Sequence, residues 1–231
     1  MIVTTSWDDG HPRDQRILRM LADRGLRGTF YLPRQHPECG RIAEGLVRDL
    51  HAAGGEIGAH TLSHPDLRRL TPPMVVEEVR ASKAWLEDVS GSEVVSFSYP
   101  FGRHDARITR LVAAAGFCSA RTLRYDRLQP PVDPFRTGIS VQAADASPLL
   151  VARTWLDLRG PLAQLVDWVE RARRAFDVAF ERHGAWHLWG HSWEIERNAD
   201  WTRLERVLDY VAGRPGVRYL TNAGLVRTEP V

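Results

Sequence analysis

The chain has 231 residues, 43% of them hydrophobic and eight of them tryptophan, so it can bury the core of one large α/β domain. Its 31 Lys and Arg nearly balance 29 Asp and Glu, which excludes a strongly basic nucleic-acid-binding protein. Since no apolar run reaches about 18 residues and no signal peptide fits before Asp8, we expect a cytoplasmic protein without a transmembrane segment.

Short β-branched or aromatic runs alternate with segments of helical periodicity, which is the pattern of βα units and a parallel sheet. No linker-like composition interrupts residues 1–231, so a single domain is expected. Strands are predicted at residues 2–7, 28–32, 56–61, 94–99, 118–122, 185–191 and 217–220, with a weaker one at 136–141. Seven or eight such repeats predict a barrel, in which chemistry gathers at the C-terminal ends of the strands.

Three helices are predicted between these strands. Residues 13–24 have one apolar face and end at Gly25, and residues 72–89 open with prolines after Thr71. Residues 162–182 carry an apolar stripe opposite a face that we expect to be solvated, formed by Arg171, Arg173 and Arg174.

The chain has two cysteines, Cys39 and Cys118. Two thiols in a chain without an export signal are expected to be reduced, and we expect both to be core residues.

Ser6-Trp7-Asp8-Asp9-Gly10 ends the first predicted strand and places two adjacent carboxylates at the rim of the barrel. Neighbouring carboxylates repel, so they need a cation or a shared proton between them. Because Asp-Asp-Gly is also common in ordinary turns, this motif alone does not identify a site.

His60 and His64 follow the third predicted strand and can face one point if they share a single helical turn that Pro65 ends. Two imidazoles and one carboxylate make a facial set that suits Zn²⁺ or a neighbouring divalent transition metal and leaves positions open for water and substrate. A histidine pair alone is often structural, but its combination with the Asp8-Asp9 pair favours a metal site.

The strand at 185–191 ends at His191, whose ordinary pKa near working pH suits a general acid. His187, earlier in the same strand, is expected to be a buried histidine outside the chemistry. At the end of another strand, Tyr99-Pro100-Phe101-Gly102 forms a turn whose backbone N–H groups can face a ligand.

Taken in chain order, the four motifs resemble those of the polysaccharide-deacetylase or NodB-homology family, also called carbohydrate esterase family four. Its Thr/Ser-Phe-Asp-Asp-Gly motif is matched by residues 6–10, and its His-Ser/Thr-x-x-His-Pro motif by residues 60–65. The resemblance spans roughly residues 1–225 and implies a distorted (β/α)7 barrel, in agreement with the strand pattern.

The resemblance also implies roles for individual residues. Asp8 would be the general base and His191 the general acid, while Asp9, His60 and His64 would bind a divalent metal. We expect Zn²⁺, with Co, Ni, Fe or Mn as alternatives.

Substrate contacts are also implied. The backbone N–H of Phe101 would stabilise the oxyanion, and Tyr99 and Trp189 would contact the substrate. With Trp7 and Trp193, these aromatic side chains suit stacking on sugar rings, although they suit a barrel core nearly as well.

Two family features are missing. Ser98 stands where the third motif has an arginine that pairs with the base, so we expect Arg136 or Arg103 to replace it, or the base to work with less help. The fourth motif has no clear counterpart, since Asp167-Trp168 falls within a predicted helix.

The function implied is a metal-dependent hydrolase that removes an N-acetyl or N-formyl group from an amino sugar. An intracellular N-acylated sugar or glycoside is the expected substrate, and the sequence predicts no oligomeric state. Two alternatives stay open: a cyclic ureide or imide amidohydrolase of the same superfamily, and a non-catalytic carbohydrate-binding homologue. The intact Asp9, His60 and His64 count against a metal-free ureide hydrolase, while Asp8 and His191 count against a protein that only binds.

Overall fold

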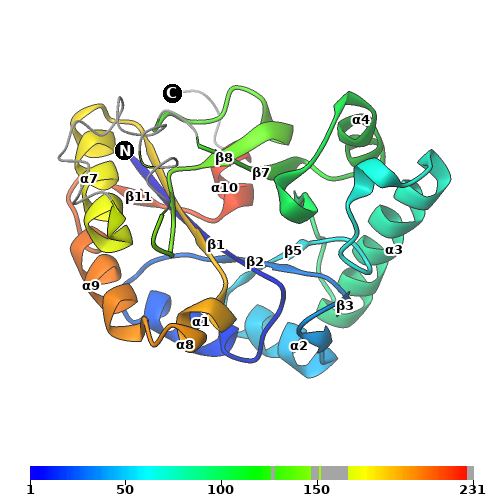
Figure 1. Ribbon diagram of the computed structural model, residues 1–231, viewed down its shortest axis with the longest axis horizontal. Coiled ribbons are helices and arrows are strands. Elements are labelled where there is room, and N and C mark those ends of the chain that lie inside the picture. Colours follow the sequence, from blue (N-terminus) through cyan, green and yellow to red (C-terminus); the bar gives the residue numbers. More distant parts are fainter. Residues whose placement is uncertain (126–127, 147–150, 152–165, 228–231) are drawn as a thin grey trace.

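The computed structural model describes residues 1–125, 128–146, 151 and 166–227. They form an α/β fold around a parallel sheet in the order β8-β7-β6-β5-β2-β1-β10-β9 (Figure 1). The strands of this path are β1 Ile2–Asp8, β2 Thr29–Leu32, β5 Glu56–Ala59, β6 Ser96–Ser98, β7 Ser119–Tyr125, β8 Thr137–Ile139, β9 Val141–Gln142 and β10 Ala185–Gly190.

The two ends of this path are the halves of one bent segment. Strand β8 pairs with β7, and β9, which follows after Ser140, pairs with β10. At the bend, Ser140 N donates to the His187 carbonyl at 3.0 Å, and His187 N donates to Ser140 Oγ at 2.9 Å. The strands therefore close into a nearly complete barrel. This confirms the predicted α/β barrel, including its weakest strand at 136–141.

Three further strands of the described residues lie outside the barrel path. Strand β11 (Arg218–Tyr219), which the sequence predicts at 217–220, pairs with β1. Strands β3 (Gln35–His36) and β4 (Gly40–Arg41) form an antiparallel hairpin that the sequence analysis does not predict.

Helices surround the strands, with α7, α9, α1, α2 and α3 on the outer side in Figure 1. The predicted helices 13–24 and 72–89 correspond to α1 and α3, whereas α2, α4 and α9 are not predicted. The α-helices are α1 Asp14–Ala22, α2 Glu44–Ala52, α3 Pro72–Ser90, α4 Ala106–Ala114, α7 Trp168–Glu181, α8 Ser192–Arg197, α9 Trp201–Val211 and α10 Asn222–Arg227. Among the described residues, no helix has both the length and the apolar character needed to cross a bilayer.

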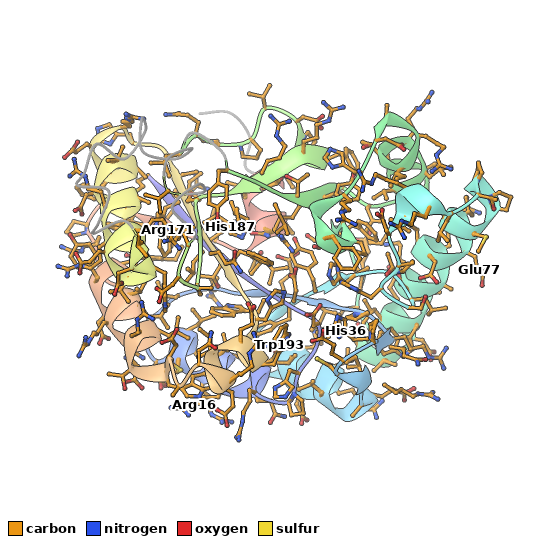
Figure 2. The ribbon with its side chains drawn as sticks, viewed as in Figure 1. Arg16, His36, Glu77, Arg171, His187 and Trp193 are labelled. Carbon is orange, nitrogen blue, oxygen red and sulfur yellow. The ribbon has the colours of Figure 1, made fainter. Side chains whose placement is uncertain are left out.

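Helix α7 corrects two expectations. Asp167 accepts hydrogen bonds from the N–H groups of Val169 and Glu170, so it caps the start of the helix instead of lying within it. The first part of the predicted helix, residues 162–165, lies outside the described residues. Arg171 is 1% exposed and donates to the carbonyls of residues 142, 144 and 166. It thereby bridges α7 to β9 and to the segment after β9. The prediction of a solvated arginine face is therefore wrong for Arg171 (Figure 2).

Both cysteines are free thiols, as expected, but neither is in the core. Cys118 is exposed just before β7, and Cys39 is half-buried in the β3–β4 turn. Large aromatic side chains fill the core instead, with Trp7, Trp168 and Trp186 among the most deeply buried.

Candidate active site

A pocket of about 240 Å³ opens at the C-terminal ends of the barrel strands. It collects side chains at the ends of β1 and β10 and after β1, β5, β6 and β10, far apart in the sequence. All the site residues that the sequence predicts line it: Asp8, Asp9, His60, His64, Tyr99, Phe101, Trp189 and His191.

The backbone around the pocket is left-handed at four residues that are not glycine. Asp9, Thr61, His64 and Phe101 have φ values of 79, 67, 57 and 58°. The expected helical turn between His60 and His64 is therefore wrong. An irregular loop brings the two rings together, in which His64 N donates to Thr61 Oγ1 at 3.0 Å.

The two imidazoles face each other through their Nε2 atoms. His60 Nδ1 donates to the Ser98 carbonyl at 2.8 Å, so Nε2 of the neutral His60 ring carries a lone pair. That atom lies 3.1 Å from His64 Nε2. Burial lowers the pKa of His60, and burial together with the neighbouring histidines His60 and His36 lowers that of His64 to about 2. Both rings are therefore neutral at working pH.

Asp9 completes this donor set. Its Oδ1 lies 3.8 Å from His60 Nε2 and 3.7 Å from His64 Nε2, and it is buried without a hydrogen-bond partner. Ligands at the usual Zn–N distance of about 2.0–2.1 Å in a tetrahedron are roughly 3.3 Å apart. The three potential ligand atoms lie near this spacing, and a buried carboxylate oxygen without a partner is costly unless a cation lies beside it, so the three residues fit a divalent metal.

Asp8 is a buried carboxylate with one oxygen engaged. Arg121 Nη2 and Trp189 Nε1 both donate to its Oδ2, the latter at 3.0 Å, while Oδ1 has no hydrogen-bond partner. Burial alone would raise the pKa of Asp8, but the charges of Arg121 and nearby histidines and the Trp189 hydrogen bond lower it below its ordinary value. Asp8 is therefore ionised, with Oδ1 available as a base.

The arginine that pairs with Asp8 is neither of the two expected. Arg103 pairs with Asp66 at 3.0 Å and Arg136 with Asp133 at 3.3 Å, both away from the base. Arg121 takes this place from strand β7.

The position of Arg121 explains how it replaces the missing residue. Ser98 and Arg121 are register partners on β6 and β7, and Arg121 Nη2 also donates to Ser98 Oγ at 2.5 Å. Paired residues on parallel strands point to the same side of a sheet, so a guanidinium from β7 reaches the space where one from β6 would lie. An arginine within the predicted strand 118–122 could have indicated this, because a buried charge needs a partner.

His191 lies at the other side of Asp9. Its Nδ1 is 2.7 Å from Glu194 Oε2, and its Nε2 is 3.5 Å from Asp9 Oδ2. Burial would lower the pKa of His191, but the hydrogen bond to Glu194 and the charges of Asp9 and Asp8 raise it above its ordinary value. No role for Glu194 is predicted from the sequence, although its three-residue spacing from His191 at a helix start is a signal that could have indicated one.

The aromatic side chains do not all face a ligand. Trp7 is fully buried and donates to Thr5 Oγ1, so of the two roles left open for it, sugar stacking and barrel core, it takes the second. The Tyr99 ring lines the pocket, but its hydroxyl donates to the Phe135 carbonyl at 3.2 Å. Phe101 is 51% exposed at the rim, edge-on to His64.

Trp189 and Trp193 each donate a hydrogen bond from the indole N–H group to one of the two adjacent aspartates. Trp189 donates to Asp8, as described above, and Trp193 Nε1 donates to Asp9 Oδ2 at 3.0 Å. Both rings also line the pocket. Their first role is therefore to hold the carboxylates.

Two more histidines lie inside the barrel and at its rim (Figure 2). His187 is buried between the hydroxyls of Thr4 and Ser6, at 3.1 and 2.7 Å, outside the pocket lining as expected. His36, which the sequence analysis misses, lines the pocket with its Nε2 3.5 Å from Asp9 Oδ1. The ligand atoms of Asp9, His36 and His64 lie within 4.8 Å of one another.

Comparison with known sequences identifies the family to which the chain belongs. The family model for polysaccharide deacetylases matches residues 1–120, just over half of the chain. Chitin deacetylase 1 of Cryptococcus neoformans var. grubii is 27% identical over 116 residues, which cover 48% of this chain and 23% of that protein. YxkH of Bacillus subtilis, described as a polysaccharide deacetylase, is 24% identical over 117 residues, covering 50% and 42%. The chain thus spans less than half the length of these relatives.

Solved structures share the whole fold. The chitin deacetylase of the fungal pathogen Colletotrichum lindemuthianum superposes with a TM-score of 0.68 over 99% of this chain and 88% of that one. The two sequences are 16% identical, so this similarity concerns the architecture alone.

Proposed function

Because the chain belongs to the polysaccharide deacetylase family, we propose that it is a metal-dependent hydrolase that removes an N-acetyl or N-formyl group from an amino sugar or glycan intermediate. The observation that carries this proposal is the convergence of Asp9 Oδ1 with the Nε2 atoms of two buried imidazoles, 3.1 to 3.8 Å apart, beside the ionised Asp8. A protein that only binds sugar needs neither the donor set nor the base.

Asp9, His60 and His64 would hold the metal, with Zn²⁺ as the expected ion. A divalent ion in this place polarises an amide carbonyl and lowers the pKa of a water molecule. The chain's own residues prepare these ligands. Ser98 fixes the tautomer of His60, and Trp193 occupies Asp9 Oδ2 so that Oδ1 is left for the metal.

Asp8 would act as the general base. Its Oδ2 is held by Arg121 and Trp189, so the proton of the attacking water goes to Oδ1. The negative charge on the former carbonyl oxygen would be stabilised in part by the backbone N–H of Phe101 at the rim.

His191 would act as the general acid. Nδ1–H donates a hydrogen bond to Glu194, which leaves the Nε2–H proton as the one that goes to the departing nitrogen. The C–N bond then breaks, and the products are a free amine and acetate or formate.

The first test is metal content and product release on the same preparation. We expect about one transition-metal ion per chain by elemental analysis, and acetate release from N-acetylated amino sugars that a chelator abolishes and added Zn²⁺ restores. A metal-free protein that releases nothing from the sugars would overturn the proposal. Release from a cyclic ureide instead would favour the amidohydrolase alternative.

Replacing Glu194 by Gln should shift the pH dependence of the enzyme. The raised pKa of His191 depends in part on the Glu194 hydrogen bond, so Glu194→Gln lowers that pKa. Since a general acid must be protonated, the alkaline limb of the kcat/KM profile is expected to move to lower pH. A pH–rate series on both proteins measures this shift.

His191→Ala serves as the reference for this experiment. Losing the acid itself should cost about 10²- to 10⁴-fold in kcat, and Glu194→Gln should cost less. An unchanged alkaline limb in Glu194→Gln would mean that Glu194 does not tune the acid.

A further inference from the structure

His36 brings a third imidazole to the metal-binding residues. It comes from the β3–β4 hairpin, is 7% exposed, and packs edge-on against His64 with ring centroids 4.6 Å apart. Its Nε2 is 3.5 Å from Asp9 Oδ1, closer to that oxygen than either His60 or His64. By distance alone, His36 could be a further ligand.

The hydrogen bonds on the other ring nitrogen argue otherwise. His36 Nδ1 accepts from the backbone N–H groups of Glu38 and Cys39, both at 3.2 Å. A nitrogen that accepts a hydrogen bond carries no proton, so the neutral ring carries its proton on Nε2. An N–H group cannot coordinate a cation, but it can donate to a carboxylate.

His60 shows the opposite arrangement. Its Nδ1 donates to a backbone carbonyl at 2.8 Å, so its Nε2 presents a lone pair to the same region. The backbone around each ring therefore sets its tautomer: a carbonyl makes His60 a ligand, and two N–H groups make His36 a donor.

We propose that His36 is a positioning residue: its Nε2–H faces Asp9 Oδ1 across 3.5 Å and attracts the carboxylate without an aligned hydrogen bond, which holds Asp9 as a ligand while His36 itself does not bind the metal. This proposal rests on the metal site of the proposed function. Asp9 then has an N–H group on the side of each oxygen: Trp193 donates a hydrogen bond to Oδ2, and His36 Nε2–H faces Oδ1, which keeps its lone pairs for the metal. Figure 2 shows the two residues, which come from distant parts of the chain and line the same pocket.

The hairpin also ties His36 to the loop that carries the other histidines. Gln35 N donates to the Leu62 carbonyl at 2.9 Å, between His60 and His64 in the sequence. Ile42 N donates to the Arg34 carbonyl at 3.0 Å and closes the base of the hairpin. The position of His36 relative to the metal ligands is therefore fixed by main-chain contacts.

The direct test is the tautomer itself, read from long-range ¹H–¹⁵N correlation spectra of the wild-type protein with and without Zn²⁺. We expect His36 to show a protonated Nε2 and a bare Nδ1 in both states, while His60 shows the reverse. A His36 ring with a protonated Nδ1 and a metal-shifted Nε2 would overturn the proposal and make His36 a ligand.

A second test uses Co²⁺ as the probe and three variants. His36→Phe keeps a ring and removes the donor, His36→Gln keeps an N–H in a similar place, and His64→Asn removes an expected ligand. His36→Phe should weaken Co²⁺ binding by about 10- to 100-fold in a chelator competition, with His36→Gln restoring most of the affinity. The visible absorption bands of bound Co²⁺ should be unchanged in both His36 variants and altered or lost in His64→Asn.

The outcomes separate this proposal from the proposed function. Altered Co²⁺ bands in both His36 variants would show that His36 coordinates the metal, with the deacetylase proposal intact. Wild-type protein that binds no metal would refute the metal-dependent function. In that case, the spectrum of the metal-free protein still shows whether Nε2 of His36 carries the proton toward Asp9.

Discussion

Asp8→Asn is expected to lower kcat by about 10²- to 10⁴-fold while leaving the bound metal in place. The amide cannot accept the proton of the attacking water, but its oxygen can still accept the hydrogen bonds of Arg121 and Trp189. The fold and the donor set of Asp9, His60 and His64 should therefore persist. Acetate release gives the loss of kcat, and elemental analysis of the same sample gives the metal content.

His60→Ala is the matched control, because His60 also borders Asp8 but belongs to the donor set. It should lose the metal and turnover together. Equal metal loss in Asp8→Asn and His60→Ala would mean that Asp8 is a ligand and would refute its role as a base. Near wild-type turnover in Asp8→Asn would place the base elsewhere.

Arg121→Met should impair both folding and catalysis. The variant leaves the buried Asp8 carboxylate without its cation, and breaking a buried pair in this way costs roughly 3–5 kcal/mol in the free energy of unfolding. The pKa of Asp8 should rise, because the charge of Arg121 helps to lower it. A base works only when deprotonated, so the acid limb of kcat/KM should move to higher pH. Denaturant unfolding and a pH–rate series measure the two effects.

A reciprocal exchange separates the role of the charge from a general loss of structure. Ser98→Arg combined with Arg121→Ser conserves composition and returns the guanidinium to β6, opposite its present place. This double variant should recover part of the stability and move the acid limb back towards its wild-type position. If Arg121→Ser alone behaves like the double variant, the guanidinium does not act through Asp8.

The sequence predicts the elements whose side-chain pattern is local. The strands that begin at Ile2, Thr29 and Ala185 and the long helix α3 are each defined by short apolar runs or by proline and glycine at their ends. Helices α2, α4 and α9 are not predicted, and the two-residue strands β3 and β4 are too short to show alternation.

The part of the site that lies in contiguous motifs is also predictable from the sequence. Asp8, Asp9, His60 and His64 lie in contiguous motifs, and the structure brings them together. Arg121 depends on which strand neighbours β6, a fact of three-dimensional pairing that no single segment contains.

His36 is harder still to predict. Its donor character depends on two backbone N–H groups in a tight turn. They set the tautomer of the ring, which the amino-acid sequence does not show. Such a role follows only from the path of the main chain.

The left-handed backbone at Asp9, Thr61, His64 and Phe101 has a consequence for engineering this protein. In that conformation a residue with a side chain costs about 1–2 kcal/mol in the free energy of folding. Replacement by glycine or asparagine, which adopt it more readily, removes part of that cost and would raise the resistance to heat. The same replacements would loosen or remove the groups that define the pocket. Thermostability and reactivity therefore compete at these four positions, and a stabilised variant that keeps its activity is better sought on the outer helices.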